Sequence, residues 1–107
     1  MTQTGEKYIW TSHSQFKMKQ YALSESLVKR VIRHPDRVEE AIVEDLVAAM
    51  KKTQSKQFPE VWVMYKPIKK DSGKIKVITA WRYPGQSPER DPIPPNILQE
   101  IKSIVGV

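Results

Sequence analysis

A histidine and a lysine one helical turn apart are the residues of this chain best suited to chemistry. Lys17 follows His13 by four residues in "TSHSQFKMKQ", so a helix starting near Ser12 would place both side chains on one face. The free backbone N–H groups at a helix start attract an anion such as phosphate. Beside one phosphate, His13 could act as base or acid while Lys17 stabilises negative charge.

A simpler interpretation of the same residues also stays open. Ser12 and Gln15 have the spacing of a capping box, so His13 could pack at the helix start without any chemistry. The second histidine, His34, precedes Pro35 and is interpreted as a helix-end residue. Two distant histidines without a cysteine make a poor metal site, so neither a metal nor another cofactor is expected.

The charge of the chain favours anionic partners. Its 107 residues include 18 Lys and Arg against 12 Asp and Glu, which gives a net charge of +6. A basic stripe on the second helix and two residues of a later strand form a candidate nucleic-acid contact, in which a tryptophan could stack on a base. A solvated helix face and a buried tryptophan are the alternatives. The candidate residues are Lys29, Arg30, Arg33, Trp81 and Arg82.

Composition narrows the class of protein further. The length suits one domain with one modest core. The lack of cysteine excludes disulfides and thiolate metal sites. No apolar run could span a bilayer and no signal peptide is visible, so a cytoplasmic protein that does not engage a membrane is expected. Phosphate-binding glycine loops and nucleophile motifs of known enzymes are absent as well.

Two helices are predicted in the first third of the chain. One runs from about His13 to Gln20, and the next starts after Ser24 and ends at His34, before Pro35. The second helix carries an apolar stripe suited to packing on a sheet. Its members are Leu27, Val28, Val31 and Ile32.

Two strands are predicted in the second half, at residues 60–66 and 74–83, because both are rich in β-branched and aromatic residues. Gly73 can take the positive φ of the turn between them, which predicts an antiparallel hairpin. Proline-rich residues 84–95 form a linker to a short helix at 96–105, capped by Asn96. Regular alternation along the second strand would place four residues on one face: Val77, Thr79, Trp81 and Tyr83.

Residues 38–52 are ambiguous between a helix and strands. Val38, Ile42, Leu46 and Met50 are spaced by four, which by itself predicts an amphipathic helix. An isolated hairpin is only marginally stable, however, so the two later strands need further strands as partners. We therefore favour two strands here, with a turn at residues 44–45.

The segment "TSHSQFKMKQYALSESLVKRVIRHPDRV" resembles the opening motif of a prokaryotic domain-of-unknown-function family, number 4258, and "KVITAW" resembles its closing strand. The family is similar to the RelE and BrnT toxins, and the resemblance covers about residues 8 to 83. His13, Lys17 and Thr79 occupy matching positions. The chain departs from the pattern at Tyr21, where the family has an arginine, and at Ala22, where it has a glycine.

The resemblance implies an α+β domain, in which two N-terminal helices pack on an antiparallel sheet of about four strands, followed here by the short C-terminal helix. It also implies a small RNA-engaging domain, in the enzymatic version a metal-independent, toxin-type ribonuclease. His13 would then be base or acid, Lys17 a phosphate contact and Thr79 a positioning hydroxyl. The alternative is a non-catalytic module that binds nucleic acid or an acidic, antitoxin-like protein. The sequence leaves the oligomeric state open.

Overall fold

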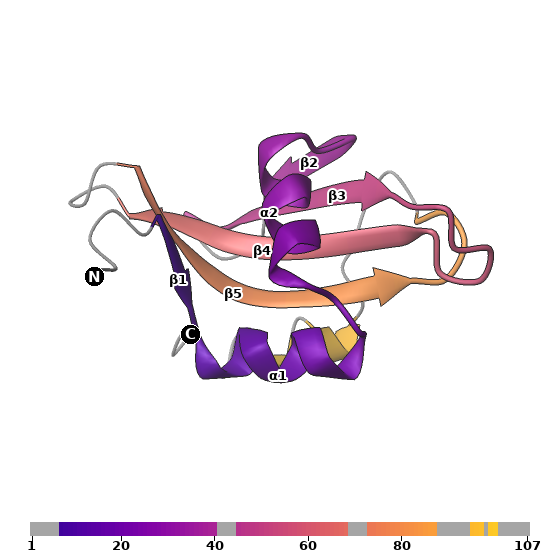
Figure 1. Cartoon of the computed structure of the whole chain (residues 1–107), viewed down its shortest axis with the longest axis horizontal. Coiled ribbons are helices and arrows are strands. Elements are labelled where there is room, and N and C mark those ends of the chain that lie inside the picture. Colours follow the sequence, from indigo (N-terminus) through magenta and orange to yellow (C-terminus); the bar gives the residue numbers. More distant parts are fainter. Residues whose placement is uncertain (1–6, 41–44, 69–72, 88–94, 98, 101–107) are drawn as a thin grey trace.

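A computed structural model of the chain describes residues 7–40, 45–68, 73–87, 95–97 and 99–100. These residues form an α+β fold in which a five-stranded sheet, ordered β1-β5-β4-β3-β2, is accompanied by two main helices (Figure 1). Residues 95–97 and 99–100 belong to a short C-terminal helix. The elements are β1 (Tyr8–Trp10), α1 (Ser12–Gln20), α2 (Glu25–Arg33), β2 (Arg37–Glu40), β3 (Val47–Lys52), β4 (Glu60–Ile68) and β5 (Lys74–Tyr83).

The sheet is mixed and has one strand more than the predicted four: β2 to β5 are antiparallel neighbours, as expected, and β1 is the additional, parallel strand. β1 pairs in parallel with β5, with Tyr8 opposite Ile75 and Trp10 opposite Val77. Beyond β1 the chain enters α1, which runs alongside β5 (Figure 1). From the sequence, the aromatic and aliphatic run at residues 8–10 could be an edge strand or a lead-in to the first helix, and the direction of the strand depends on a partner 67 positions away in the chain.

The start of α1 differs by one residue from the predicted one. Thr11, not Ser12, is the N-cap, and its hydroxyl accepts a hydrogen bond from the backbone N–H of Ser14 at 3.0 Å. The same hydroxyl donates to the carbonyl of Val77 at 2.8 Å. Thr11 therefore both caps the helix and fastens its start to β5, which a Ser12–Gln15 capping box would not do. His13 becomes the second helical residue.

The prediction for α2 is confirmed. The Ser24 hydroxyl accepts from the N–H of Leu27 at 3.1 Å, and the helix ends at Arg33 with His34 as its C-cap. Its predicted stripe faces the sheet, with three members buried and Leu27 partly buried. The buried three are Val28, Val31 and Ile32.

Residues 37–40 and 47–52 form strands, as favoured over the helix. β2 and β3 are antiparallel, with Val38 opposite Ala49, and β3 pairs in turn with β4. The four-residue spacing is therefore not a helical period here, because pairing with β4 decides the conformation. Asp45 lies in the turn with a φ of 68°, whereas Glu44 lies outside the described residues.

A bulge in β5 overturns the predicted alternation of its side chains. Met64 pairs with Thr79, but Tyr65 pairs with Val77, so Ile78 is an extra residue in β5. Val77 and Ala80 consequently contribute to one apolar cluster, whereas Ile78 contributes to the other. Val77 thus faces away from Trp81, contrary to the prediction.

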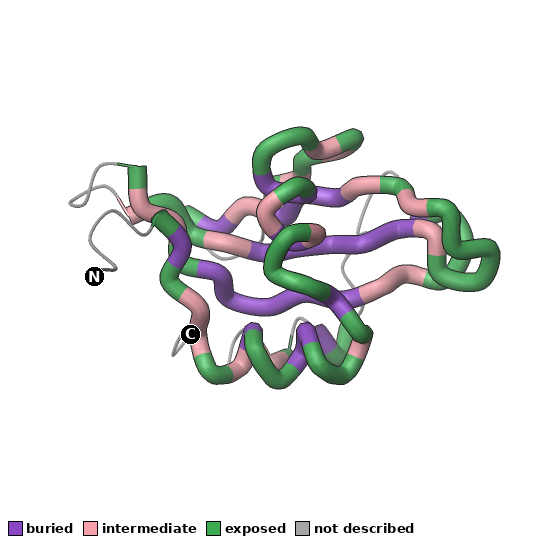
Figure 2. Tube along the Cα trace, viewed as in Figure 1, coloured by how far each residue is buried: buried purple, intermediate pink, exposed green. Residues whose placement is uncertain are grey.

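Two apolar clusters lie on the two faces of the sheet, whose central strands are buried along most of their length (Figure 2). One cluster joins α2 and Met18 of α1 to the strands. The other includes Trp62 and Trp81, stacked with ring centroids 5.8 Å apart, and Ile97 from the C-terminal helix. Pro95 is already helical, so Asn96 is not the cap that was predicted.

Candidate nucleic-acid interface

His13 and Lys17 lie together on α1, as their spacing predicts, and both approach the carboxylate of Glu100 in the C-terminal helix. Lys17 Nζ lies 3.2 Å from Glu100 Oε1, and His13 Nε2 lies 3.3 Å from the same oxygen. The histidine contact lacks hydrogen-bond geometry, which leaves Nε2 buried without a hydrogen-bond partner among the described residues. We call these three residues the closed cluster, because its histidine and lysine already face a carboxylate of the same chain.

Burial limits what the closed cluster can touch. The side chain of Lys17 is 5% exposed, against 25% for His13 and 32% for Glu100. Lys17 also donates to Gln20 Oε1 at 3.4 Å and lies over the ring of Tyr21. A charge this deep needs nearby partners, because burying it unpaired is costly. Only His13 and Glu100 retain appreciable contact with solvent.

Thr79 and Trp81, two further predicted site residues, are buried. Thr79 is 0% exposed and Trp81 is 1% exposed. The Thr79 hydroxyl and the Trp81 indole N–H have no hydrogen-bond partner within the described part of the chain. Trp81 is therefore a core residue stacked on Trp62, not a surface for stacking bases, and Thr79 cannot touch a ligand from this position.

Tyr21, in the link between α1 and α2, contacts both Lys17 of the closed cluster and Arg82 of β5. The ring of Tyr21 lies under Lys17, while its carbonyl accepts from Arg82 Nε at 3.0 Å. Ala22, at the position where the resembled family has glycine, has a φ of 56°. Left-handed backbone favours glycine, so a glycine at this position would be less strained than the alanine.

A second cationic region, the basic groove, lies where α2 leaves the end of the sheet uncovered. Arg82 pairs with Val61, and Val61 pairs with Lys51, so the two cations flank one apolar residue across three strands. Leu27 and Arg30 of α2 form the adjoining wall, and residues 52–55 at the end of β3 complete it. The groove has a volume of about 440 Å³.

Charge in the basic groove is almost entirely positive. Its lining includes Arg30, Lys51, Lys52 and Arg82 and no carboxylate. Lys51 donates to the carbonyl of His34 at 3.0 Å and lies 4.0 Å from Asp36, just outside the groove. Within the described residues, no hydrogen bond or ion pair is made by the side chains of Arg30 and Lys52. Of these cations, Lys51 is thus partly compensated by Asp36, whereas Arg30 and Arg82 have no carboxylate partner among the described residues.

The other two predicted binding residues of α2 point elsewhere. Lys29 and Arg33 lie over the ring of Tyr8, at 5.3 and 5.8 Å from its centroid. Arg33 Nε also donates to the Tyr8 hydroxyl at 3.1 Å. The basic stripe thus divides, because successive helical residues diverge by about 100°. Arg30 reaches the groove, while its neighbours fasten α2 to β1.

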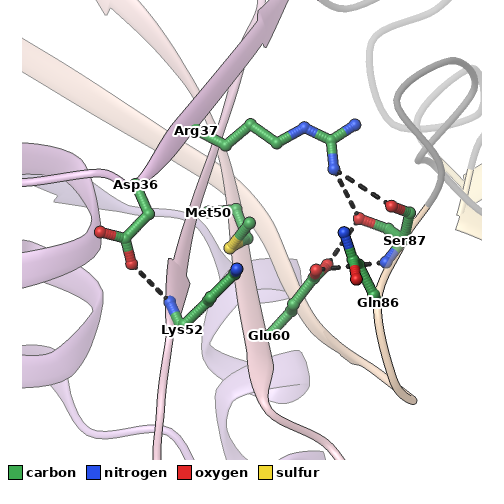
Figure 3. A pocket seen from close by; sticks show the side chains of 7 residues that line it. All are labelled: Asp36, Arg37, Met50, Lys52, Glu60, Gln86 and Ser87. Atoms are coloured by element: carbon green, nitrogen blue, oxygen red, sulfur yellow. Dashed lines mark hydrogen bonds between the residues drawn. The ribbon is translucent and has the colours of Figure 1, made fainter.

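A neighbouring pocket of about 370 Å³ differs sharply in charge (Figure 3). It contains Glu60, whose carboxylate accepts from the hydroxyl and the N–H of Ser87, and Arg37, which donates to Ser87. Asp36 is a second carboxylate in its lining. Lys52 lines both spaces, and its amino group points into this pocket in Figure 3. Two carboxylates make this pocket unsuited to a phosphate.

Sequence reasoning missed three residues of these regions: Lys51, Lys52 and Glu100. The two lysines end β3, and only the pairing of β3 with β4 and of β4 with β5 brings Lys51 level with Arg82. Glu100 lies 83 positions from Lys17. In the sequence, Glu100 stands about one helical turn after the apolar Ile97 on the predicted C-terminal helix. That position does not indicate that Lys17 would be its ion-pair partner.

The described residues hold no group of three or more His, Asp or Glu side chains arranged for a metal ion. Within the same part of the chain, no helix is long and apolar enough to cross a membrane. No protein-family model, curated protein or solved structure matches this chain. The resemblance to family 4258 therefore stays a prediction that rests on short motifs, and function has to be argued from the surface itself.

Proposed function

We propose that this protein is an RNA-binding domain that holds backbone phosphates in the basic groove. The observation that carries the proposal is the lining of the groove, in which Arg30, Lys51 and Arg82 supply positive charge and no residue is a carboxylate. Phosphate contacts supply most of the sequence-independent affinity of proteins for nucleic acids. The net charge of +6 adds a long-range attraction that favours encounter with such a polymer.

The fold prepares the groove for phosphate before any ligand arrives. Arg82 is held by the Tyr21 carbonyl through Nε, which leaves its terminal nitrogens available to a phosphate. Lys51 is held by the His34 carbonyl and lies 4.0 Å from Asp36, so both cations are positioned in advance. Ordering long side chains in advance lowers the entropic cost of binding. Arg30, on the facing helix, completes a cationic surface on two sides.

RNA is proposed over other anionic polymers because of the motifs around α1. The segment from Thr11 to Ser24 resembles a family similar to RelE and BrnT toxins, which are ribonucleases. The positive φ of Ala22, at the position of the family's glycine, agrees with that resemblance. The groove itself recognises phosphate, so a DNA strand of the same sequence is the appropriate competitor in a binding experiment.

Fluorescence anisotropy with a labelled RNA oligonucleotide tests this proposal. Affinity should fall steeply between about 50 and about 200 mM salt, and Arg30→Ala should lower the log–log salt slope by about 1. Lys19→Ala is the matched control, because Lys19 is an exposed cation of α1 outside the groove. Absence of binding at low salt, or equal effects of the two substitutions, would contradict the proposal.

The contact between His13 and Glu100 favours a second candidate function, a metal-independent ribonuclease. A carboxylate close to an imidazole can stabilise the protonated form of the ring during proton transfer through its charge, without a hydrogen bond to it. Here the two groups are 3.3 Å apart, and His13 is the more accessible of the two α1 residues. Such cleavage uses the ribose 2′-hydroxyl as an internal nucleophile, with His13 as base or acid.

Total RNA incubated with the purified protein in the presence of EDTA tests the ribonuclease. Wild-type protein should shorten the RNA, while His13→Ala should not. His34→Ala is the matched control, because His34 is an exposed helix-end residue remote from Glu100 in sequence and without contact to it. RNA that stays equally intact with wild type and His13→Ala would exclude this candidate and leave the binding proposal standing.

A further inference from the structure

An exposed aromatic ring lies on the loop that forms one wall of the basic groove. Phe58 is 40% exposed and belongs to the connection between β3 and β4. The same connection supplies Thr53, Gln54 and Ser55 to the groove lining. Phe58 is not itself a lining residue, but a partly exposed phenylalanine on the loop that supplies three of them adds an apolar, planar surface to a region otherwise built for anions.

This loop is held in place by its own hydrogen bonds. The carbonyl of Pro59 accepts from the N–H of Thr53 at 2.6 Å and from the Thr53 hydroxyl at 3.0 Å. The N–H of Phe58 donates to the hydroxyl of Ser55 at 3.2 Å, and Ser55 lines the groove. The backbone of Phe58 is therefore hydrogen-bonded to a residue of the groove wall, on a loop whose conformation is fixed by these bonds.

Phosphate contacts and an aromatic platform together are the recognition device of single-stranded nucleic acids. A cationic groove follows the backbone, and unpaired bases stack on nearby aromatic rings. Bases inside a duplex are already stacked on one another and cannot lie on an external ring. Thr53, Gln54 and Ser55 add neutral groups that can donate to or accept from a ribose or a base edge.

We propose that the groove selects single-stranded over double-stranded RNA, because Phe58 stacks on an unpaired base while the groove cations hold adjacent phosphates. This inference rests on the proposed function and names the class of RNA that the same site takes. Trp81, which the sequence suggested for stacking, is buried, so Phe58 would fill the role from a different element.

Competition binding with an unpaired RNA of about 12 nucleotides and with a duplex of equal length tests the inference. Wild-type protein should prefer the single strand. Phe58→Ala should weaken single-strand binding by about 5- to 100-fold and leave duplex binding unchanged. Phe58→Trp keeps an aromatic platform and should retain the preference. Phe16→Ala is the matched control, since Phe16 is 63% exposed but lies on α1 outside the groove.

The outcomes separate this inference from the proposed function. If single-stranded RNA binds with a steep salt dependence that Arg30→Ala reduces, but Phe58→Ala binds as tightly as wild type, the stacking inference is overturned alone. Equal affinity of wild type for the two RNA forms would overturn it as well. If wild type binds neither form at low salt, both proposals fail. Circular dichroism of Phe58→Ala and Phe58→Trp confirms that the folded state is compared throughout.

Discussion

The closed cluster and the basic groove both contain cationic side chains, and they differ in whether the fold supplies the anion. In the closed cluster, Glu100 lies within 3.3 Å of His13 and Lys17. In the basic groove, no lining residue is a carboxylate. Arg82 and Lys51 are held by carbonyl groups, and Lys51 also lies 4.0 Å from Asp36, outside the lining. A cation that already has its carboxylate stabilises the fold, whereas one without it remains available to a ligand.

The largest expected effect falls on the closed cluster. Glu100→Ala removes the carboxylate partner of the buried Lys17 amino group, and should lower the free energy of unfolding by about 1–3 kcal/mol. Solvent contact of Glu100 keeps the expected loss below that of a fully buried pair. Urea denaturation measures it, with Gln99→Ala as control because Gln99 is exposed in the same helix. An unchanged free energy of unfolding would show that the contact between Lys17 and Glu100 does not stabilise the fold, and would contradict the contrast between the closed cluster and the basic groove.

A double-mutant cycle sharpens the assignment of that loss. Lys17→Met removes the buried charge and keeps an unbranched side chain, so it should recover part of the stability lost in Glu100→Ala. The interaction free energy between the two positions should be about 0.5–3 kcal/mol. Additive effects of the two substitutions would mean that Glu100 acts through packing of the C-terminal helix and not through Lys17.

Salt dependence distinguishes the two regions by function. Arg30→Ala should lower the log–log slope of RNA affinity against salt by about 1, because a phosphate contact is lost. Lys17→Met should leave the slope unchanged, since its amino group is buried against Glu100. Anisotropy titrations at several salt concentrations provide both slopes. A lower slope for Lys17→Met would mean that the closed cluster also opens to phosphate.

The smallest effect concerns the link that holds both regions. Ala22→Gly removes the strain of a positive φ at an exposed alanine, and should raise the free energy of unfolding by about 0.5–1 kcal/mol after the entropy cost of glycine. Thermal denaturation measures the gain. RNA affinity should not change, since the Tyr21 carbonyl keeps its bond to Arg82. Lower RNA affinity would show that the backbone conformation at Ala22 affects the position of Arg82 in the groove.

Local rules account for the parts that sequence reasoning obtained. The Ser24 cap, the stripe of α2 and its end before Pro35 depend on neighbours within about one helical turn, and all are confirmed. β5 has the predicted bounds, because β-branched and aromatic residues fill it throughout. The adjacency of His13 and Lys17 follows in the same way from a spacing of four in a helix.

Predictions that depended on distant partners were less successful. The Thr11 cap was missed because its hydroxyl is also fastened to Val77, on a strand near the other end of the chain. A bulge at Ile78 changed which side chains of β5 share a face, and regular alternation could not foresee it. Trp81 was offered as a surface residue, although the cross-strand pairing with Trp62 buries it.

By itself the sequence determined an α+β chain with two capped helices, a β-hairpin, a positive charge and a His13–Lys17 pair on one helix face. Only the tertiary structure decided that Glu100 contacts both residues of that pair. It also decided that Arg30, Lys51 and Arg82 line one groove whose lining has no carboxylate. The physical reason is the range of the interactions. Helix period and capping act within a few residues, whereas charge compensation depends on which distant segments strand register and helix packing bring together.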